Sequence, residues 1–216
     1  DYLDEARRYY TNIVGKYGMD VLLPYIKTIG ACYLTCALFT IFVQGGLMVG
    51  LYGGISPMKF FSTMKEAILF VFATCSSVAT IPLNLKCTKA LGVDDKIADF
   101  VIPFGAVMNM NGTAIYEAVA VIFASQVFGI HLTVTQQIMV MVTAVLASVG
   151  TAGIPGSGLV MMTIVLNAVN LPLETIGLLA GIDRILNMAR VIPNIVGDAA
   201  AAVVVAKSEG ALHPEK

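Results

Sequence analysis

The sequence predicts an all-α, polytopic membrane protein with two re-entrant helical hairpins and one broken transmembrane helix. Hydrophobic residues make up 57% of the 216 residues and charged residues only 12%, with a mean hydropathy of +0.83. Soluble domains carry about twice that share of charge. Several apolar stretches approach or exceed the roughly 20 residues that a membrane-spanning helix needs, whereas others are shorter or are interrupted by polar residues.

The N-terminal part of the chain predicts one surface element and one spanning helix. Residues 1–20 are polar and compatible with a helix, and we expect them to lie at the membrane surface or to form a linker. An uncharged core then runs from Ile29 to Leu51 and predicts the first spanning helix. Because the chain starts with Asp1 rather than Met, we expect it to be a fragment or a processed product.

Two short apolar helices end in small residues and predict the hairpins. Met58–Ala73 runs into the segment 74–82 (TCSSVATIP), and Ile138–Ala147 runs into the segment 148–158 (SVGTAGIPGSG). Both turns contain four mostly small residues followed by Ile-Pro. A half-length apolar segment that turns at small residues fits a hairpin that enters and leaves the membrane on the same side. The alternative for the first segment is a short surface helix followed by a loop.

The apolar stretch Phe100–Phe128 predicts a transmembrane helix with a break in its middle. Asn109–Thr113 (NMNGT) interrupts it, and both Asn and Gly favour turns over helix interiors. Unwound backbone at that depth survives only inside protein or beside a wet cavity. The alternative is a helix that is merely kinked.

After two further apolar stretches, Gly158–Leu171 and Ile176–Ala180, the last predicted helix carries a polar stripe. It runs from Gly181 to Ala206, and its polar residues are spaced four, three, four and four apart, within an arc of roughly 80°. The stripe consists of Asp183, Asn187, Arg190, Asn194 and Asp198. Arg184 lies off that arc, close enough to the helix start to reach the membrane interface. Such a stripe faces protein or a polar cavity and marks a substrate or ion path, although a buried structural ion pair between helices is the alternative.

The residue types indicate a carboxylate bound together with a cation. Paired interrupted segments in two halves of a membrane chain point to a transporter binding site. Arg190 offers a planar fork for bidentate carboxylate binding. The side chains of Asn109, Asn194 and Asp198 are hard oxygen ligands that suit an alkali cation. A cation would also offset the cost of moving an anion against the membrane potential, about 2.3 kcal/mol per charge per 100 mV.

Other classes of function are disfavoured. The net charge is −1 and no basic run is present, which argues against nucleic acid as a partner. The four cysteines lie in or beside apolar segments, so we expect free buried thiols. The motif at 156–158 (GSG) suggests a serine protease, but no histidine lies in a long apolar span to activate Ser157. Asp183 and Asp198 share one face of one helix, which does not suit an acid dyad. We predict that the protein is not an enzyme.

Four segments together resemble the glutamate/aspartate and dicarboxylate:cation (sodium or proton) symporter family. They are Ser76-Ser77, Asn109–Thr113, Gly150–Gly156 and Asp183–Asp198, in the family's order, and the likeness covers roughly Val21–Glu209. The resemblance implies that residues 21–209 form the mobile transport domain, the C-terminal half of a transporter, followed by a polar tail at 210–216. It also implies an elevator-like movement against a homotrimeric scaffold that is absent from this chain. The expected location is a bacterial-type plasma membrane, with the C-terminus in the cytoplasm.

The resemblance also implies the site residues. Arg190 would hold the substrate's side-chain carboxylate, helped by Thr113, and Ser77 with the backbone of both hairpin tips would hold the main carboxylate. The implied substrate contacts are Ser77, Thr113, Gly153, Pro155, Gly158, Asn187, Arg190 and Asn194. One implied sodium site consists of Gly105, Asn109, Asn194 and Asp198, and a second of the tip backbone at Ser148, Val149 and Thr151.

Three positions depart from the family's usual pattern. Asn111 replaces an acid that serves a third sodium site, so we expect fewer coupled sodium ions, or a proton. Asn187 replaces an aspartate that binds the ammonium group of amino-acid substrates, and Val191 replaces a hydroxyl residue. We therefore expect cation-coupled symport of dicarboxylates or acidic amino acids, with the two changes at 187 and 191 favouring a dicarboxylate such as succinate or malate. An amide oxygen still accepts from an ammonium group, which leaves acidic amino acids open as substrates. The alternatives are a glutamate/aspartate symporter with altered coupling and an incomplete fragment that does not transport.

Overall fold

A computed structural model of the chain describes residues 22–213, and every regular element in this part is a helix. The predicted surface helix at 1–20 lies outside the described residues. The helices are α2 (Leu22–Leu38), the π-helical continuation η2 (Phe39–Tyr52), α3 (Pro57–Thr74), α4 (Ser77–Ala90), α5 (Asp95–Met108), α6 (Asn111–Val127), α7 (Val134–Val149), α8 (Ser157–Ala168), α9 (Glu174–Ala180) and α10 (Asp183–Ser208). Three stretches are long and apolar enough to cross a membrane, namely Leu23–Tyr52, Asp95–Val127 and Asp183–Ser208. The predicted all-helical, multi-pass class is confirmed.

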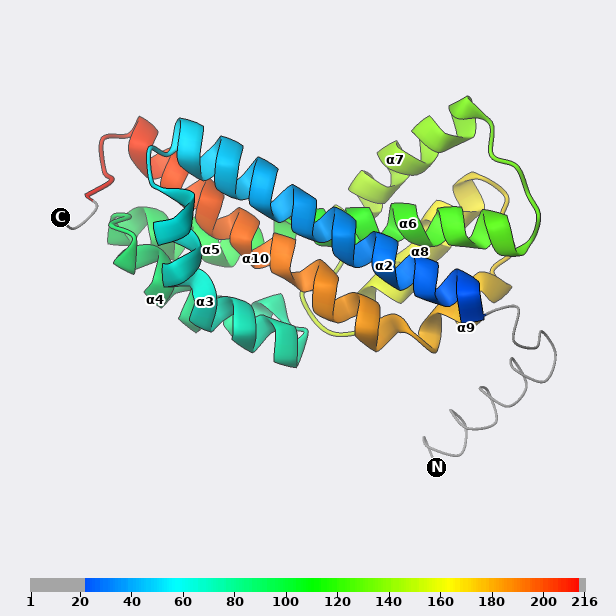
Figure 1. Cartoon of the computed structure of the whole chain (residues 1–216). Helices are drawn as coiled ribbons and strands as arrows, with labels where there is room; N and C mark the ends of the chain where they lie inside the picture. The colour runs from blue at the N-terminus through cyan, green and yellow to red at the C-terminus, as the bar shows by residue number, and fades with distance from the viewer. Residues whose placement is uncertain (1–21, 214–216) are drawn as a thin grey trace.

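Helix α10 is the central element of the molecule. It runs beside α2 and η2, with α3–α5 against its C-terminal half and α6–α9 towards its N-terminal half (Figure 1). In its most apolar stretch 72% of the residues are buried, against 28% in the corresponding stretch of α2–η2. The polar stripe therefore lies on a helix that is enclosed by protein, as the periodicity predicts.

Two separate apolar cores hold the helices together. One core joins α2 and α6–α9 to the start of α10 and includes Phe123, Leu166 and Leu186. The other joins η2 and α3–α5 to the rest of α10 and includes Phe60 and Val203. Because α10 passes through both cores, its middle lies where they meet. The polar residues of the stripe are concentrated in that region.

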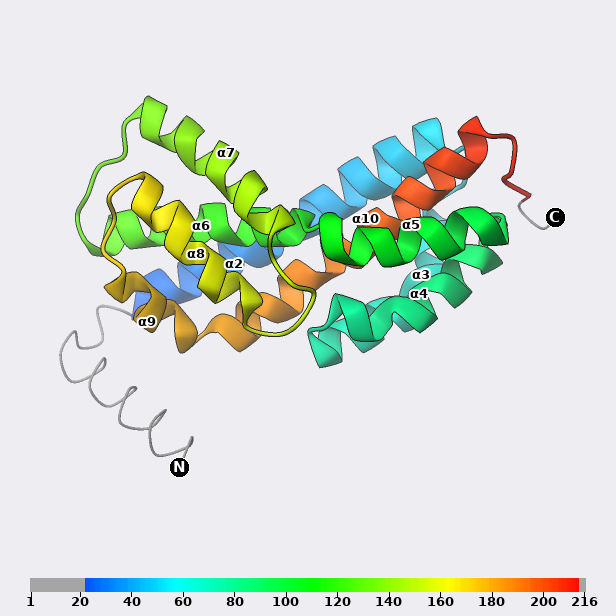
Figure 2. The same ribbon diagram turned by 180° about the vertical axis from the view of Figure 1, so that it is seen from behind.

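Two helix pairs occupy the positions of the predicted hairpins, and Figure 2 shows them over opposite halves of the molecule. In the first pair, Cys75 follows the end of α3 with a left-handed φ of 56°, and Ser76 caps the start of α4 by accepting a hydrogen bond from the Ala79 N–H. We call residues 75–77 the first tip. The second tip, residues 150–156, joins α7 to α8 and ends at Gly156, whose φ is 82°.

The shared Ile-Pro pattern does not give the two tips the same local structure. Ile81-Pro82 lies inside the first turns of α4, whereas Ile154-Pro155 stays in the non-helical second tip. The similarity between the two turns is therefore one of position in the chain, before an interrupted helix, rather than of backbone conformation.

The predicted interruption at 109–113 is shorter in the structure than in the sequence pattern. Helix α5 stops at Met108, only Asn109 and Met110 leave the helical conformation, and α6 begins at Asn111. Gly112 lies against the Arg190 carbonyl so closely that a side chain would collide with it. The break thus brings α6 into direct contact with the middle of α10.

Candidate functional site

Arg190 is buried, and none of the described acids lies within ion-pair distance of it. Its guanidinium is 2% exposed, lies over the Tyr116 ring at 4.7 Å from the centroid, and donates from Nε to Asn187 Oδ1 at 2.8 Å. Its Nη1 has no hydrogen-bond partner. None of the ion pairs between described residues includes Arg190. The alternative of a structural ion pair is therefore not supported, and an unpaired buried cation is costly unless an anion joins it.

The Arg190 side chain borders a small polar pocket to which several distant segments contribute. The pocket is lined by Cys75, Ser77, Met110, Thr113, Ala152, Gly153, Ile154, Ser157, Asn187, Arg190, Val191 and Asn194. The Ser77 hydroxyl is also buried without a partner. The pocket thus contains a free cationic donor and a free hydroxyl, as a carboxylate ligand requires.

The pocket is closed by contact between the two tips. Ser76 Oγ donates to the Gly153 carbonyl at 3.0 Å, and the Val78 N–H donates to the same carbonyl at 3.3 Å. The free volume inside is about 10 Å³, enough for one water-sized sphere. A four-carbon dicarboxylate therefore enters only if the tips separate or the lining side chains rotate.

A second polar cluster lies further along α10, around Asp198. Asn109 Nδ2 donates to Asp198 Oδ1 at 2.8 Å and to the Asn194 carbonyl at 3.3 Å. Asp198 is 1% exposed, and its other oxygen, Oδ2, has no partner. Gly105 allows this approach, because a side chain there would collide with the carboxylate. The cluster offers the Asn194 carbonyl and the Asp198 carboxylate, whose Oδ2 has no partner, and oxygens of this kind suit a small hard cation.

The segment implied as a second sodium site makes its own hydrogen bonds. Ser148 and Thr151 are buried, and Thr151 Oγ1 donates to the Ala147 carbonyl at 3.1 Å. The Thr151 N–H donates to the Ser148 carbonyl at 3.0 Å. Val149 is 39% exposed. The Ala147 and Ser148 carbonyls at the end of α7 thus already accept hydrogen bonds from Thr151.

The structure brings most of the implied substrate contacts together. Ser77, Thr113, Gly153, Asn187, Arg190 and Asn194 all line the pocket. Gly158 lies behind the pocket against Arg190 Nη1, with no room for a side chain. Pro155 is exposed and does not line the pocket in this closed arrangement.

Three residues beside the site were not singled out by the sequence pattern. Glu117 is fully buried, and neither of its carboxylate oxygens has a partner. Tyr116 donates its hydroxyl to Asp183 Oδ1 at 3.3 Å, besides stacking on Arg190. Gln44 Nε2 donates to the Pro193 carbonyl at 2.7 Å, and its Oε1 is unpartnered. The sequence signal that could have found them is that they are polar residues within apolar spans, where such a residue is a candidate for function.

Asn111 takes part in a cluster of three amides around Gly197. A side chain at Gly197 would lie 2.5 Å from Asn109 Nδ2, 2.7 Å from Gln44 Nε2 and 3.0 Å from Asn111 Nδ2. Three neutral amides meet here, so Asn111 brings no negative charge to the cluster. The expectation of fewer coupled sodium ions, or a proton, stays a prediction.

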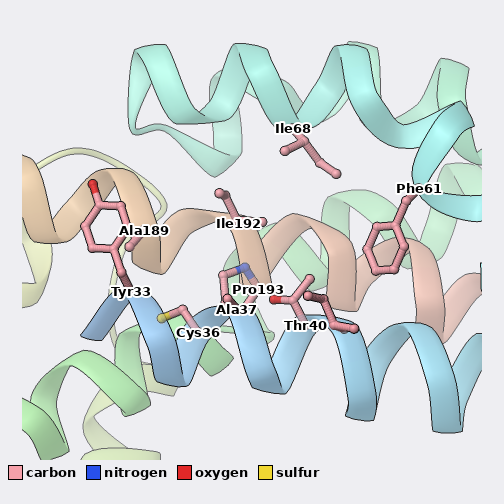
Figure 3. A pocket seen from close by; sticks show the side chains of 10 residues that line it. Tyr33, Cys36, Ala37, Thr40, Phe61, Ile68, Ala189, Ile192 and Pro193 are labelled. Carbon is pink, nitrogen blue, oxygen red and sulfur yellow. The ribbon is translucent and has the colours of Figure 1, made fainter. Parts of the chain in front are cut away.

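A larger cavity on another side of α10 differs chemically from the carboxylate pocket. It measures about 260 Å³ and lies between α2–η2, α3 and α10 (Figure 3). Its lining carries no charged side chain. Tyr33, Cys36, Phe61, Ile68 and Pro193 are among the residues that line it. It therefore does not fit a dianion.

Comparison with known proteins identifies the family to which this sequence is similar. The family model described as the sodium:dicarboxylate symporter family matches residues 8–208. The chain is 37% identical over 203 residues to a proton/sodium-glutamate symport protein of Bacillus subtilis (strain 168), covering 94% of this chain and 47% of that protein. It is 38% identical over 204 residues to a C4-dicarboxylate transport protein of Paracidovorax citrulli (strain AAC00-1), covering 94% and 45%.

These comparisons also define the extent of the match. A proton/sodium-glutamate symport protein of Geobacillus stearothermophilus is 34% identical over 203 residues, covering 94% of this chain and 48% of that protein. The chain thus spans about half the length of the curated relatives it matches. The family and the relatives are named as symporters or transport proteins, not as enzymes.

Proposed function

The chain belongs to the sodium:dicarboxylate symporter family, and on this premise we propose that it forms the substrate-binding part of a cation-coupled dicarboxylate symporter. One observation supports the proposal most directly. Arg190 is 98% removed from solvent with an unpartnered Nη1, and it lines the same pocket as Ser77, whose buried hydroxyl is also unpartnered. A carboxylate is the ligand that satisfies both donors and neutralises the buried charge.

The position of Asn187 supports a dicarboxylate rather than an acidic amino acid. Its Oδ1 already accepts from Arg190 Nε. Arg190 thus occupies one of the two acceptor sites of that oxygen, and the other polar group of the side chain is an NH₂, which donates hydrogen bonds and cannot accept one from an ammonium group. Val191, which also lines the pocket, adds no acceptor. The site as built therefore favours substrates such as succinate or malate over glutamate and aspartate.

Binding can be tested on the chain itself, purified in detergent. We expect succinate to raise the midpoint of thermal unfolding in the presence of sodium, because a ligand that binds only the folded state stabilises it by about 2.7 kcal/mol at one hundred times its Kd. Aspartate at the same concentration should stabilise less. If no dicarboxylate stabilises the chain in any cation, the site is incomplete and the chain is a non-transporting fragment.

Asp198 is expected to be essential for the sodium dependence of that stabilisation. Replacing Asp198 with asparagine removes the uncompensated Oδ2 charge but keeps the hydrogen-bonding shape around Asn109. We expect succinate stabilisation in Asp198→Asn to become the same in sodium and in choline. Exposed Asp99→Asn, at the far end of α5, is the matched control and should retain the sodium effect. A variant that keeps the wild-type sodium dependence would remove Asp198 from the cation site.

Glu117 is proposed to carry a coupled proton. An ionised carboxylate with both oxygens buried and unpartnered costs several kcal/mol, so the neutral acid is the form that fits beside a dianionic substrate. We expect succinate affinity to fall as pH rises above the range in which succinate itself titrates. Glu117→Gln, which mimics the protonated acid, should bind succinate with little dependence on pH. Glu174→Gln, at an exposed position of α9, should behave like the wild type.

The remaining features of the whole transporter are proposed from the family. The scaffold would be contributed by the part of the relatives that this chain does not match, and we propose that it forms a homotrimer. The described helices would move against it as one transport domain, with the α3–α4 and α7–α8 pairs as re-entrant hairpins and α5–α6 as the broken transmembrane helix. We place the protein in a bacterial plasma membrane with a cytoplasmic C-terminus.

A further inference from the structure

Arg184 makes a long-range contact that neither the substrate pocket nor the cation cluster explains. It lies in the first turn of α10, is exposed, and points away from the polar stripe. Its Nη2 donates to the Ala73 carbonyl at 2.7 Å, across 111 residues of sequence. The side chain therefore reaches the end of α3.

The positive charge of Arg184 is disfavoured by the dipole of its own helix, α10, and favoured by the dipole of α3, which carries its partner. A helix dipole disfavours a cation near the N-terminus, where Arg184 stands, and favours one near the C-terminus, where Ala73 lies. The last carbonyls of a helix also lack partners within the helix. The contact thus stabilises the C-terminal end of α3, whereas the same positive charge is unfavourable at the N-terminal end of α10.

Ala73 lies immediately before the first tip. The chain then turns at Cys75, whose left-handed φ ends α3, and Ser77 opens α4 with its hydroxyl in the pocket. On the other side, the first tip contacts the second tip through the Gly153 carbonyl. The contact from Arg184 joins the first tip region to α10, the helix that also carries Arg190.

We propose that Arg184 is a positioning residue: it fixes the first tip to α10 and so sets the placement of Ser77 opposite Arg190. Ser77 and Arg190 both line the pocket and each has an unpartnered donor, so the separation of the two side chains decides whether one carboxylate-bearing substrate satisfies both. Because Arg184 and Arg190 share one helix, this separation is maintained when the contacts to the second tip break. The role of Ser77 in binding rests on the proposed function, whereas the anchoring of the tip does not.

Anchoring of the tip is tested without any substrate. Cys75 is 1% exposed at the tip, and Cys87, 4% exposed in α4, serves as an internal control. We expect Arg184→Ala to raise the rate of maleimide labelling at Cys75 roughly fivefold, as mapped by mass spectrometry. This is the change in an equilibrium constant that the loss of one hydrogen bond of about 1 kcal/mol produces. Labelling of Cys87 should stay unchanged, and Arg184→Lys should restore most of the protection. Equal labelling of Cys75 in wild type and Arg184→Ala overturns the proposal.

The link to Ser77 is tested by a double-mutant cycle on succinate affinity. Arg184→Ala should weaken binding about fivefold when Ser77 is present, but hardly at all when Ser77 is already alanine. Additive losses would overturn the positioning of Ser77. If the wild-type chain fails to bind succinate, the proposed function fails, and the Cys75 labelling still decides the anchoring.

Discussion

Replacing Arg190 with alanine should abolish succinate binding while the chain remains folded. The guanidinium is the buried cation that faces the pocket, and truncating one member of a buried, hydrogen-bonded charge pair costs about 2–5 kcal/mol. Affinity should therefore fall at least about thirtyfold, and the stabilising effect of succinate on thermal unfolding should disappear.

The fold is expected to survive this change because Arg190 is not neutralised by a structural acid. Its loss leaves Asn187 Oδ1 without this donor and removes the contact with the Tyr116 ring, and it also removes an unpartnered Nη1 from the interior. Arg190→Lys is the matched control: it keeps the charge but loses the planar fork, so affinity should be intermediate. Unchanged succinate affinity in Arg190→Ala, with an unchanged circular dichroism spectrum, would show that the guanidinium is structural.

Replacing Asn187 with aspartate should shift selectivity from succinate towards aspartate. The new carboxylate keeps one oxygen for Arg190 Nε and offers a second, charged oxygen to the substrate ammonium. A hydrogen bond to a charged group contributes about 1.5–3 kcal/mol, so the ratio of aspartate to succinate affinity should rise roughly tenfold to a hundredfold. Succinate itself should bind more weakly, because the added negative charge faces a dianion.

The selectivity is measured by competition, with each acid displacing radiolabelled succinate or aspartate from the purified variant. Asn167→Asp, an exposed position in α8, adds the same charge outside the pocket and should leave the ratio as in the wild type. An unchanged ratio in Asn187→Asp would mean that position 187 only orients Arg190 and does not meet the substrate's amino group.

Local patterns were sufficient to predict the helices and the polar face. The small residues after Ala73 and Ala147 predict the turns between paired helices, and α3 and α7 end within two residues of these positions. The spacing of the stripe in α10 predicts that its five residues share one buried face, and all five are at most 8% exposed. Hydrophobic periodicity and turn chemistry act over a few residues, so a single segment carries this information.

The pairing of these groups was decided only by the tertiary structure. The sequence alone left open whether Arg190 is neutralised by an acid, but the folded chain gives it a neutral amide partner three residues away and a pocket beside Ser77. Glu117 without a partner, and Arg184 bound to Ala73, likewise depend on which helices meet. Periodicity places a side chain on a face of its helix, but the group that it meets there depends on contacts between segments far apart in the chain, 111 residues for Arg184 and 149 for Gln44.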